Sequence, residues 1–464
     1  MLKFLVKLLL FFFLILTLFS WASSVFTKGD INSFKGRELN ESNNIELAFF
    51  GSSRALCTYD PRVFENGLGK RAYNYGFGSQ RLFTSLPMME SHLSNDVKLG
   101  VVDIFSASIQ ELPFEEDVNN FQYNTLDNTE NSLQKLLTFV QIYGFENIFE
   151  IFPLVRNHAL WDELLLKPEY VLKENIDYYK GFRSELSFNQ TRWNRSSDGN
   201  KRNLHPRIQE NRKLTDGEKE IIDRIIKLFE EKQIPLLFVS APMHKDYITN
   251  RNYTYQNLIK QYLNQKGIPF IDYNSLWDEL GLGTHDFRDI GHLNSSGALK
   301  VSLHLNNYIN EHYQLIRGKS LNNTYKNRYS LLSSSQNESI LKKELINDYI
   351  LNKVGVESVE IYKDQYERLE VLFVGKRINR VKVNITFKIT KESEIRNLPV
   401  EVQNRVKNGR YSYSTTLGRP FYFENNQFKV LLLNFPFSEI EELKISIGNK
   451  RLVKVIEEKH IFLD

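Results

Sequence analysis

Short apolar runs alternate with longer amphipathic segments along most of the first 315 residues. Residues 45–53, 97–105, 234–242 and 269–274 are dominated by apolar side chains over strand-like lengths, which is typical of strands buried on both faces. Residues 72–78 predict a further short strand. The run at 45–53 ends in Gly-Ser-Ser, and small residues after a strand indicate a turn.

The amphipathic segments have the spacing of helices. Residues 215–233 place isoleucines at helical intervals among charged residues. Residues 253–266 predict a second helix, which Gly267 ends, and residues 295–313 predict a closing helix. Strands that alternate with helices predict an α/β fold, with a mostly parallel sheet covered on both faces. In such sheets the ligand site lies at the carboxyl ends of the strands, which is where residues 51–53 fall.

A long insertion interrupts this alternation at residues 106–214. It contains helical stretches at 131–143 and 145–155, and then becomes polar and basic over 192–213. An insertion of this length is typical of a lid or a substrate-facing subdomain, and a solvated loop is the alternative interpretation. The basic residues equally fit a site that attracts an anionic glycan or lipid headgroup and a plain solvated face.

The pattern changes again after residue 316. Residues 317–345 are polar and rich in Asn and Ser, which indicates a linker. Residues 346–464 contain several short runs of β-branched residues, some with clear period-2 alternation such as 381–386. They predict a small C-terminal β-sandwich. The α/β domain is therefore expected to span residues 31–316.

The first 30 residues have the pattern of an export segment. Lys3 and Lys7 precede the uncharged run from Leu8 to Trp21. A positive flank before an apolar run predicts that the remainder lies outside the cytoplasm. We expect a signal anchor, a single N-terminal helix that holds the protein on the cytoplasmic membrane. A cleaved signal peptide is the alternative, because small residues follow Trp21.

Charge and cysteine content narrow the classes of function. The chain has 60 Lys and Arg against 56 Asp and Glu, a net charge of +4, and no basic block long enough for nucleic acid, which we therefore exclude as a partner. The single cysteine, Cys57, excludes an intramolecular disulfide. As a lone apolar side chain, Cys57 is interpreted as a buried packing residue rather than a nucleophile.

Two short segments carry the candidate chemistry, namely residues 50–54 (Phe-Gly-Ser-Ser-Arg) and residues 286–294 (Asp-Phe-Arg-Asp-Ile-Gly-His-Leu-Asn). Asp289 lies three residues before His292, so its carboxylate can accept a hydrogen bond from Nδ1 and leave Nε2 free as a base. A serine held opposite Nε2, here Ser53, would become a nucleophile. This chemistry needs no metal and no cofactor. The alternative is a metal site built from Asp289, His292 and the nearby His285 and Asp286, although the spacing fits no familiar zinc pattern.

Both segments resemble motifs of the SGNH (GDSL-like) hydrolases, which begin with a strand ending in Gly-Asp-Ser and close with Asp-x-x-His before the last helix. Residues 51–53 (Gly-Ser-Ser) and 289–292 (Asp-Ile-Gly-His) are similar to these motifs at the matching ends of residues 40–315. Residues 292–297 (His-Leu-Asn-Ser-Ser-Gly) resemble a membrane-anchored branch, which includes alginate O-acetyltransferases and the D-alanyl transfer protein of teichoic acids. The resemblance implies a three-layer α/β/α domain with Ser53 as nucleophile, His292 as base and Asp289 as its orienting partner.

The chain also departs from the family pattern. Ser52 stands where the family has Asp, and Val101-Val102-Asp103 replaces the third motif, so no Asn donor for the oxyanion is assigned. The second motif is matched to residues 74–78, which implies oxyanion binding by the backbone N–H groups of Ser53 and Gly76.

Three other residues are candidates for substrate contact, namely Arg54, Asn74 and His244. Arg54 has a competing interpretation as a member of a structural ion pair. His244 follows a central strand, so its side chain is a candidate to face the pocket.

These observations predict an extracytoplasmic serine enzyme that transfers an O-acyl group to a cell-envelope polysaccharide or glycolipid, and the resemblance implies that this group is acetyl. The resemblance implies a membrane-bound O-acyltransferase as the partner that supplies the acyl group. Two alternatives use the same residues differently. An esterase or deacetylase would have water as the acceptor, and a non-catalytic envelope assembly or glycan-binding protein would have lost the chemistry.

Overall fold

The computed structural model describes most of the α/β region and the strands of the C-terminal part. The described residues are 2–25, 35, 38–39, 44–109, 111–114, 116–160, 176–185, 213–245, 250–313, 341–344, 355–363, 368–375, 382–388, 410–416, 421–423, 426–436, 439–449 and 452–462. The basic stretch at 192–212 and residues 317–340 of the predicted linker lie outside them.

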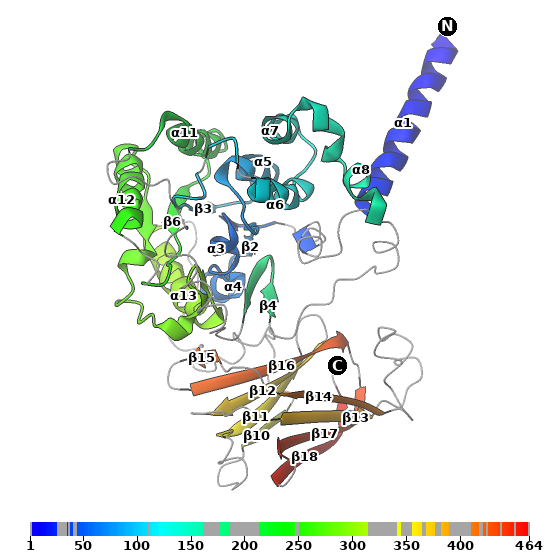
Figure 1. Cartoon of the computed structure of the whole chain (residues 1–464), viewed down its shortest axis with the longest axis vertical. Coiled ribbons are helices and arrows are strands. Elements are labelled where there is room, and N and C mark those ends of the chain that lie inside the picture. The colour runs from blue at the N-terminus through cyan, green and yellow to red at the C-terminus, as the bar shows by residue number, and fades with distance from the viewer. Residues whose placement is uncertain are drawn as a thin grey trace.

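A five-stranded parallel sheet forms the centre of the α/β unit (Figure 1). Its strands follow the order β2-β1-β3-β6-β7, with β1 Leu47–Phe50, β2 Ala72–Asn74, β3 Leu99–Asp103, β6 Leu236–Ser240 and β7 Phe270–Asp272. Every pair of neighbours is parallel. The α/β class and the five strands predicted from the apolar runs are therefore confirmed.

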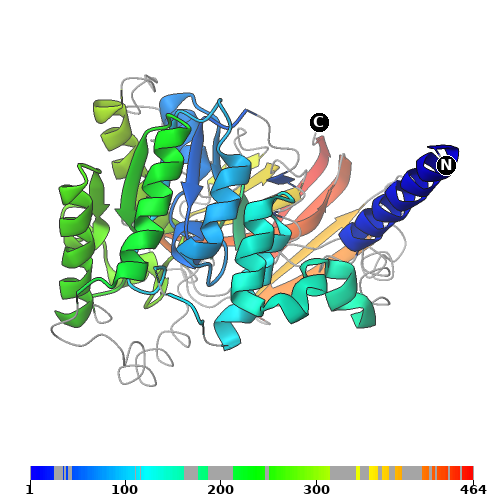
Figure 2. The same cartoon turned by 90° about the horizontal axis from the view of Figure 1, so that it is seen from above.

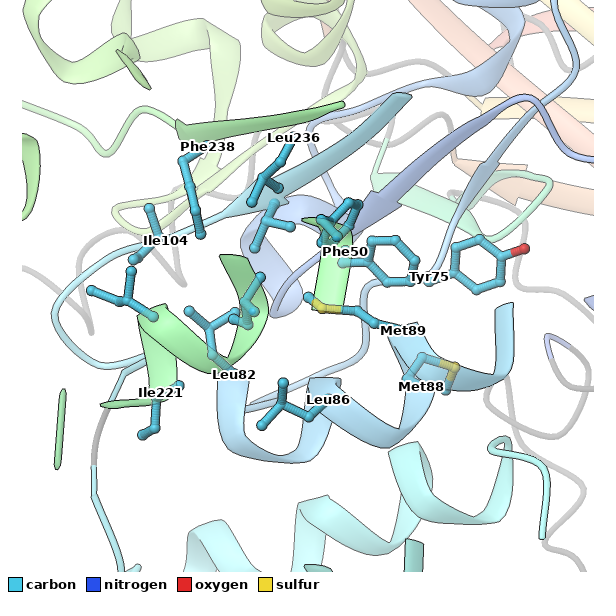
Figure 3. Packing of buried hydrophobic residues seen from close by; sticks show 14 of the residues in the cluster. Phe50, Tyr75, Leu82, Leu86, Met88, Met89, Ile104, Ile221, Leu236 and Phe238 are labelled. Atoms are coloured by element: carbon cyan, nitrogen blue, oxygen red, sulfur yellow. The ribbon is translucent and has the colours of Figure 1, made fainter. Parts of the chain in front are cut away.

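Helices cover both faces of this sheet (Figure 2). Two hydrophobic clusters fill the space between the layers. The helices are α3 Ser53–Leu56, α4 Pro61–Leu68, α5 Leu82–His92, α11 Asp216–Glu231, α12 Asn250–Gln265 and α13 Ser295–His312. Leu47 and Phe49 of β1 pack with α4 and α13, whereas Ala48 and Phe50 pack with α5, α11 and α12. Alternate residues of a strand point to opposite faces, so β1 contributes to both clusters. Figure 3 shows the second cluster around Phe50.

Local sequence signals set where these helices begin. Thr215 caps α11 in a capping box with Glu218, which satisfies two backbone N–H groups at once. Asp60 caps α4, whose first residue is Pro61. Asn294 caps α13 by accepting hydrogen bonds from two backbone N–H groups. The predicted helices at 215–233, 253–266 and 295–313 are present with ends shifted by a few residues.

The insertion begins with a helical subdomain. It comprises α6 Glu116–Asp127, α7 Leu133–Tyr143, the 3₁₀ helix η1 Phe145–Ile151, α8 Pro153–Asn157 and the short η2 His158–Leu160. Tyr123 stacks on Tyr143 with their ring centroids 4.2 Å apart. The helical stretches predicted at 131–143 and 145–155 are thus present, the second as η1 followed by α8.

A β-hairpin of the insertion, β4 Ile176–Tyr179 and β5 Phe182–Glu185, reaches the edge of the central sheet (Figure 1). The backbone N–H of Asn74 donates to the carbonyl of Lys180 in its turn, 3.0 Å away. Ser184 donates to the carbonyl of Leu293 at 3.4 Å. The hairpin is therefore bonded both to the end of β2 and to the segment before α13.

The N-terminal helix α1 Leu2–Val25 packs against the end of the helical subdomain (Figure 1). Phe19 of α1 meets Phe152 edge to face, with ring centroids 4.9 Å apart. Among the described residues, no helix qualifies as long and apolar enough to cross a membrane. The membrane anchor therefore stays a prediction.

The C-terminal part forms two antiparallel sheets. The strands are β10 Leu341–Glu344, β11 Ser358–Lys363, β12 Arg368–Gly375, β13 Lys382–Lys388, β14 Arg410–Thr416, β15 Phe421–Phe423, β16 Asn426–Pro436, β17 Glu439–Asn449 and β18 Leu452–Phe462. One sheet has the order β10-β11-β12-β16-β15 and the other β14-β13-β17-β18. β10 lies inside the segment predicted as a linker. Its charged sequence did not indicate a strand, but its backbone pairs with β11.

Candidate active site

Ser53 lies at the point where the first strand turns into a helix. β1 ends at Phe50, Gly51 follows, Ser52 caps α3, and Ser53 is the first residue of α3. Gly51 has a φ of 149°, and a Cβ at this position would lie 2.8 Å from the Cβ of Asp103. Only glycine fits this conformation and this close approach without strain. The turn therefore presents Ser53 at the carboxyl edge of the sheet.

Asp289 and His292 lie in a small hairpin just before α13. Thr284–Asp286 form the 3₁₀ helix η4, and the two short strands β8 Phe287–Asp289 and β9 His292–Leu293 pair antiparallel. The N–H of Gly291 donates to Asp289 Oδ1 at 3.0 Å, which closes the turn between the two strands. Asn294 donates through Nδ2 to the carbonyl of His285 and so ties the hairpin to the start of α13.

These two segments, 239 residues apart in sequence, meet through a continuous chain of hydrogen bonds. Ser53 Oγ lies 2.8 Å from His292 Nε2. His292 Nδ1 lies 2.7 Å from Asp289 Oδ1. The three side chains have the arrangement of a nucleophile, a base and an orienting carboxylate. Ser53 is half-buried, and the side chain of His292 is 24% exposed, so the chain of groups opens to solvent at its reactive end.

Electrostatics favour the reactive protonation states. Burial lowers the pKa of His292; Asp289 opposes this effect, and the guanidinium groups of Arg288 and Arg54 add to it. Burial alone would raise the pKa of Asp289, but the hydrogen-bonded His292, the Arg288 charge and the Gly291 N–H together hold this pKa well below its usual range. At neutral pH, Asp289 is therefore a carboxylate, and His292 is neutral with Nε2 able to accept a proton from Ser53.

Arg288 and Glu185 are neighbours of the triad that the sequence did not single out. Arg288 Nε donates to Asp289 Oδ2 at 3.1 Å, so both carboxylate oxygens of Asp289 are engaged. Glu185, at the end of β5, lies 4.0 Å from the Arg288 guanidinium. Arg288 precedes Asp289 directly in the sequence, and this adjacency was a signal that could have predicted the contact between the two side chains. Glu185 comes from the insertion, and no sequence motif pointed to it.

Asn74 and Gly76 lie close to the Ser53 turn, but their hydrogen-bonding groups are already engaged. The Asn74 side chain is fully buried and donates to the carbonyls of Ala55 and Tyr59, each at 2.8 Å. Its Oδ1 accepts the N–H of Gly76 at 2.9 Å. This geometry is at odds with the predicted roles, because Asn74 cannot reach a substrate and the Gly76 N–H is not available to an oxyanion. Instead, both residues brace the turn that carries Ser53.

The side chain of Arg54 is buried beside Ser53 and has no hydrogen-bond partner among the described residues. Only 4% of the residue is exposed, and none of its three side-chain nitrogens makes a hydrogen bond. Its guanidinium lies over the Phe105 ring, 4.4 Å from the ring centroid. Among the described residues it forms no ion pair within 4.0 Å, which is at odds with the interpretation as a structural ion-pair residue. Burial raises the pKa of Asp103, and the positive charge of Arg54 opposes this rise. The same charge adds to the lowering of the His292 pKa by burial.

His244 lies beside the hairpin that carries Asp289, with its ring packed among other side chains. Its Nε2 lies 3.0 Å from Thr284 Oγ1, and its ring meets Trp277 and Phe287 edge to face. Its backbone N–H donates to the carbonyl of Ile290. These contacts give His244 a supporting position behind the hairpin, whereas the sequence predicted that it faces a substrate.

The alternative chemistries find little support in this geometry. Cys57 is buried, and burial raises the pKa of its thiol, so it is protonated and unreactive. In the described parts of the chain, no three His, Cys, Asp or Glu side chains are grouped as metal ligands. Asp286 instead accepts hydrogen bonds from Ser296 and Lys300, at 2.7 and 2.8 Å.

Comparisons with known proteins identify no relative, since no family model and no curated protein matches the chain.

Proposed function

We propose that the protein is a serine-dependent acyltransferase that forms an acyl ester on Ser53. The single observation that carries this proposal is the continuous chain from Ser53 through His292 to Asp289, with distances of 2.8 and 2.7 Å. Such a chain has no evident structural purpose at a solvent-accessible edge of a sheet, whereas it suits a nucleophile that needs a base. An α/β/α arrangement of the SGNH type agrees with the layered parallel sheet.

The proposed reaction has two symmetrical halves. Ser53 Oγ attacks the carbonyl carbon of the donor ester while its proton moves to His292 Nε2. The tetrahedral adduct collapses, the bond to the donor breaks, and the leaving oxygen takes the proton from His292. An acceptor hydroxyl then gives its proton to His292 and attacks the ester on Ser53. The second adduct collapses, the bond to Ser53 Oγ breaks, and this oxygen takes the proton back from His292. Asp289 orients the ring and stabilises its charged form throughout.

Negative charge on the adduct needs stabilisation that Asn74 and Gly76 do not supply in this geometry. Ser53 is the first residue of α3, and the first N–H groups of a helix have no partner within it. The buried charge of Arg54, which acts in a medium of low dielectric constant, is the second contribution. We assign the oxyanion to the Ser53 N–H and to the field of Arg54.

The identity of donor and acceptor rests on the sequence resemblance alone. We propose O-acetyl transfer from a membrane-bound O-acyltransferase partner to an envelope polysaccharide or glycolipid. The two C-terminal antiparallel sheets, which we propose to stack as a β-sandwich, offer a second module that could hold the glycan.

Exposed apolar side chains support a location at a membrane. On α1 they are Phe4, Val6, Leu10, Phe11, Phe13, Leu14, Ile15 and Leu18. The other large apolar side chains exposed among the described residues are Phe121, Leu133, Leu137, Phe145 and Phe149, all on α6, α7 or η1 of the same helical subdomain. This subdomain is also the part that packs on α1, through Phe152. We therefore propose that α1 anchors the chain and that the subdomain lies at the lipid surface.

A topology experiment tests this location. Alkaline phosphatase fused after residue 40 should be active and should sediment with membranes after alkaline carbonate washing. Reversal of charge at Lys3 and Lys7 is the matched variant and should reduce phosphatase activity, because flanking cations set the orientation. An inactive fusion would contradict the orientation, and a soluble mature protein that starts near Ser23 would contradict the anchor.

Covalent trapping tests the chemistry directly. Incubation with an activated acetyl ester should add one acetyl group to the intact protein, and peptide mass mapping should place it on Ser53. Arg54→Met should slow this step by about 10²–10³-fold, the usual cost of one lost oxyanion contribution. Arg54→Lys, which keeps the charge, should slow the reaction less. Acetylation at another residue, or none in folded protein, would overturn the proposal.

A further inference from the structure

Two charged residues that follow α1 are bonded into the α/β unit next to the active site. Lys35 is only 2% exposed. Its Nζ donates to the carbonyl of Gly76 and, at 3.0 Å, to the carbonyl of Gly181. The ammonium group also lies over the ring of Phe77, 4.4 Å from the centroid. Lys35 therefore joins the loop after β2 to the turn of the β4–β5 hairpin.

Glu38 binds the same hairpin turn through its backbone N–H groups. Its Oε1 accepts the N–H of Lys180 at 3.0 Å, and its Oε2 accepts the N–H of Gly181 at 2.9 Å. Oε2 also accepts the hydroxyls of Tyr178 and Tyr73, at 2.6 and 3.3 Å. Lys180 and Gly181 both have positive φ, so the carboxylate binds a tight turn whose N–H groups point together.

A buried ammonium group is costly unless its partners replace water. Burial lowers the pKa of Lys35 well below its ordinary value, and the nearby Glu38 charge opposes this effect. Two carbonyls, the face of one aromatic ring and one nearby carboxylate thus stabilise the buried ammonium group in place of water. These contacts join Lys35 to residues that lie 41 and 146 positions further along the sequence. A set of contacts this complete is specific rather than incidental.

The two segments held by this pair lie next to groups that support the triad, the Gly76 loop next to the turn that carries Ser53 and the hairpin next to Arg288. A Cβ added to Gly76 would lie 2.7 Å from the backbone nitrogen of Leu56 and 3.0 Å from the carbonyl of Ser52, so Gly76 rests directly on the nucleophile turn. At the other end of the hairpin, Glu185 lies 4.0 Å from the Arg288 guanidinium, which binds Asp289. Displacement of either segment would change the alignment of the reacting groups.

We propose that Lys35 and Glu38 are positioning residues, which press the Gly76 loop and the β4–β5 hairpin against the triad. This inference rests on the proposed function and assigns part of the active-site framework to the segment that follows α1. Neither residue touches the reacting atoms. The segment that follows α1 therefore influences the geometry around Ser53, so a displacement of this segment would change the position of the nucleophile.

Acetylation kinetics of the full chain test the inference. Lys35→Met should lower kcat for the activated acetyl ester about 10–100-fold with little change in KM, since small misplacements of reacting groups cost about this much. Lys70→Met is the matched control, because Lys70 makes a partly exposed ion pair with Glu46 at 3.1 Å, and it should keep the parental rate. Glu38→Gln keeps the shape of the side chain, and its effect on kcat should not add to that of Lys35→Met.

The outcomes separate this inference from the proposed function. If the parental protein forms no acetyl adduct, the proposed function fails. If it does, and folded Lys35→Met and Glu38→Gln both react at the parental kcat, the inference is wrong. Should Lys35→Met not fold, Glu38→Gln alone decides. Hydrogen exchange gives a second readout, in which the amides of Lys180 and Gly181 should lose protection while those of β1 and β3 keep it.

Discussion

Replacing Ser53 by alanine is expected to lower turnover of an activated acyl ester by about 10⁶-fold while the fold stays intact. The hydroxyl of Ser53 is the nucleophile in the proposed reaction, and its hydrogen bond is to His292. Its loss leaves only binding and electrostatic effects to act on the ester. The rate is measured from release of a chromogenic leaving group, and intact mass should show no acetyl adduct on the variant.

Ser52→Ala is the matched control, because it removes the adjacent hydroxyl. Ser52 Oγ accepts the N–H of Arg54 at 3.3 Å as the cap of α3 and has no contact with His292 among the hydrogen bonds observed. The variant should lose about 1 kcal/mol of stability and keep most of its activity. An inactive Ser52→Ala beside an active Ser53→Ala would reverse the assignment. A folded Ser53→Ala that still supported envelope modification in cells would favour a binding protein over an enzyme.

Sequence patterns predicted the sheet, and they singled out three residues that the structure brings together, for a physical reason. The strands are buried on both faces, so each is a continuous apolar run, such as Leu47–Phe50. In a parallel sheet every carboxyl end lies at the same edge, so residues that follow the first strand meet residues before the last helix. This rule brings Ser53 to His292 at 2.8 Å without any information on the residues between them.

The same patterns failed where a contact depends on how other segments of the chain pack around a side chain. Asn74 was a reasonable candidate for substrate contact because it ends β2, yet its amide turns inward to the carbonyls of Ala55 and Tyr59. Arg54 was expected to find an anion and instead lies over an aromatic ring. Their surroundings come from other segments of the chain, and no periodicity in the sequence indicates how those segments pack against them.

The insertion and the segment after α1 illustrate the same limit. Lys35 and Glu38 lie in a short polar stretch that has the composition of an ordinary surface segment. Their importance follows from the burial of Lys35 and from the hairpin turn at Lys180 and Gly181. Neither can be inferred until the hairpin is placed, because a buried lysine is improbable from sequence alone.

Asp289→Asn should lower the rate of acyl transfer by about 10⁴-fold, which is less than the loss on replacing Ser53. An amide can donate to Nδ1, which would favour the tautomer with its proton on Nε2, where it no longer accepts from Ser53. Arg288 Nε can still donate to the amide oxygen in the place of Oδ2, which should keep the side chain in position. The hydrogen bond from the Gly291 N–H is lost, because the amide nitrogen in the place of Oδ1 cannot accept it. Rates of chromogenic ester release check the loss of activity, and a crystal structure of the variant checks the position of the side chain.

The pH profile separates this tautomer effect from simple loss of structure. The neutral form of His292 is the base, so the rate of the parental protein rises with pH through the pKa of His292, which burial places below its ordinary value. Asp289 raises that pKa, so its removal lets burial and the charges of Arg288 and Arg54 lower it further. The acid limb of Asp289→Asn should therefore move to lower pH while its plateau falls. A limb that moved to higher pH would contradict the assigned electrostatics, and an unchanged plateau would remove Asp289 from the mechanism.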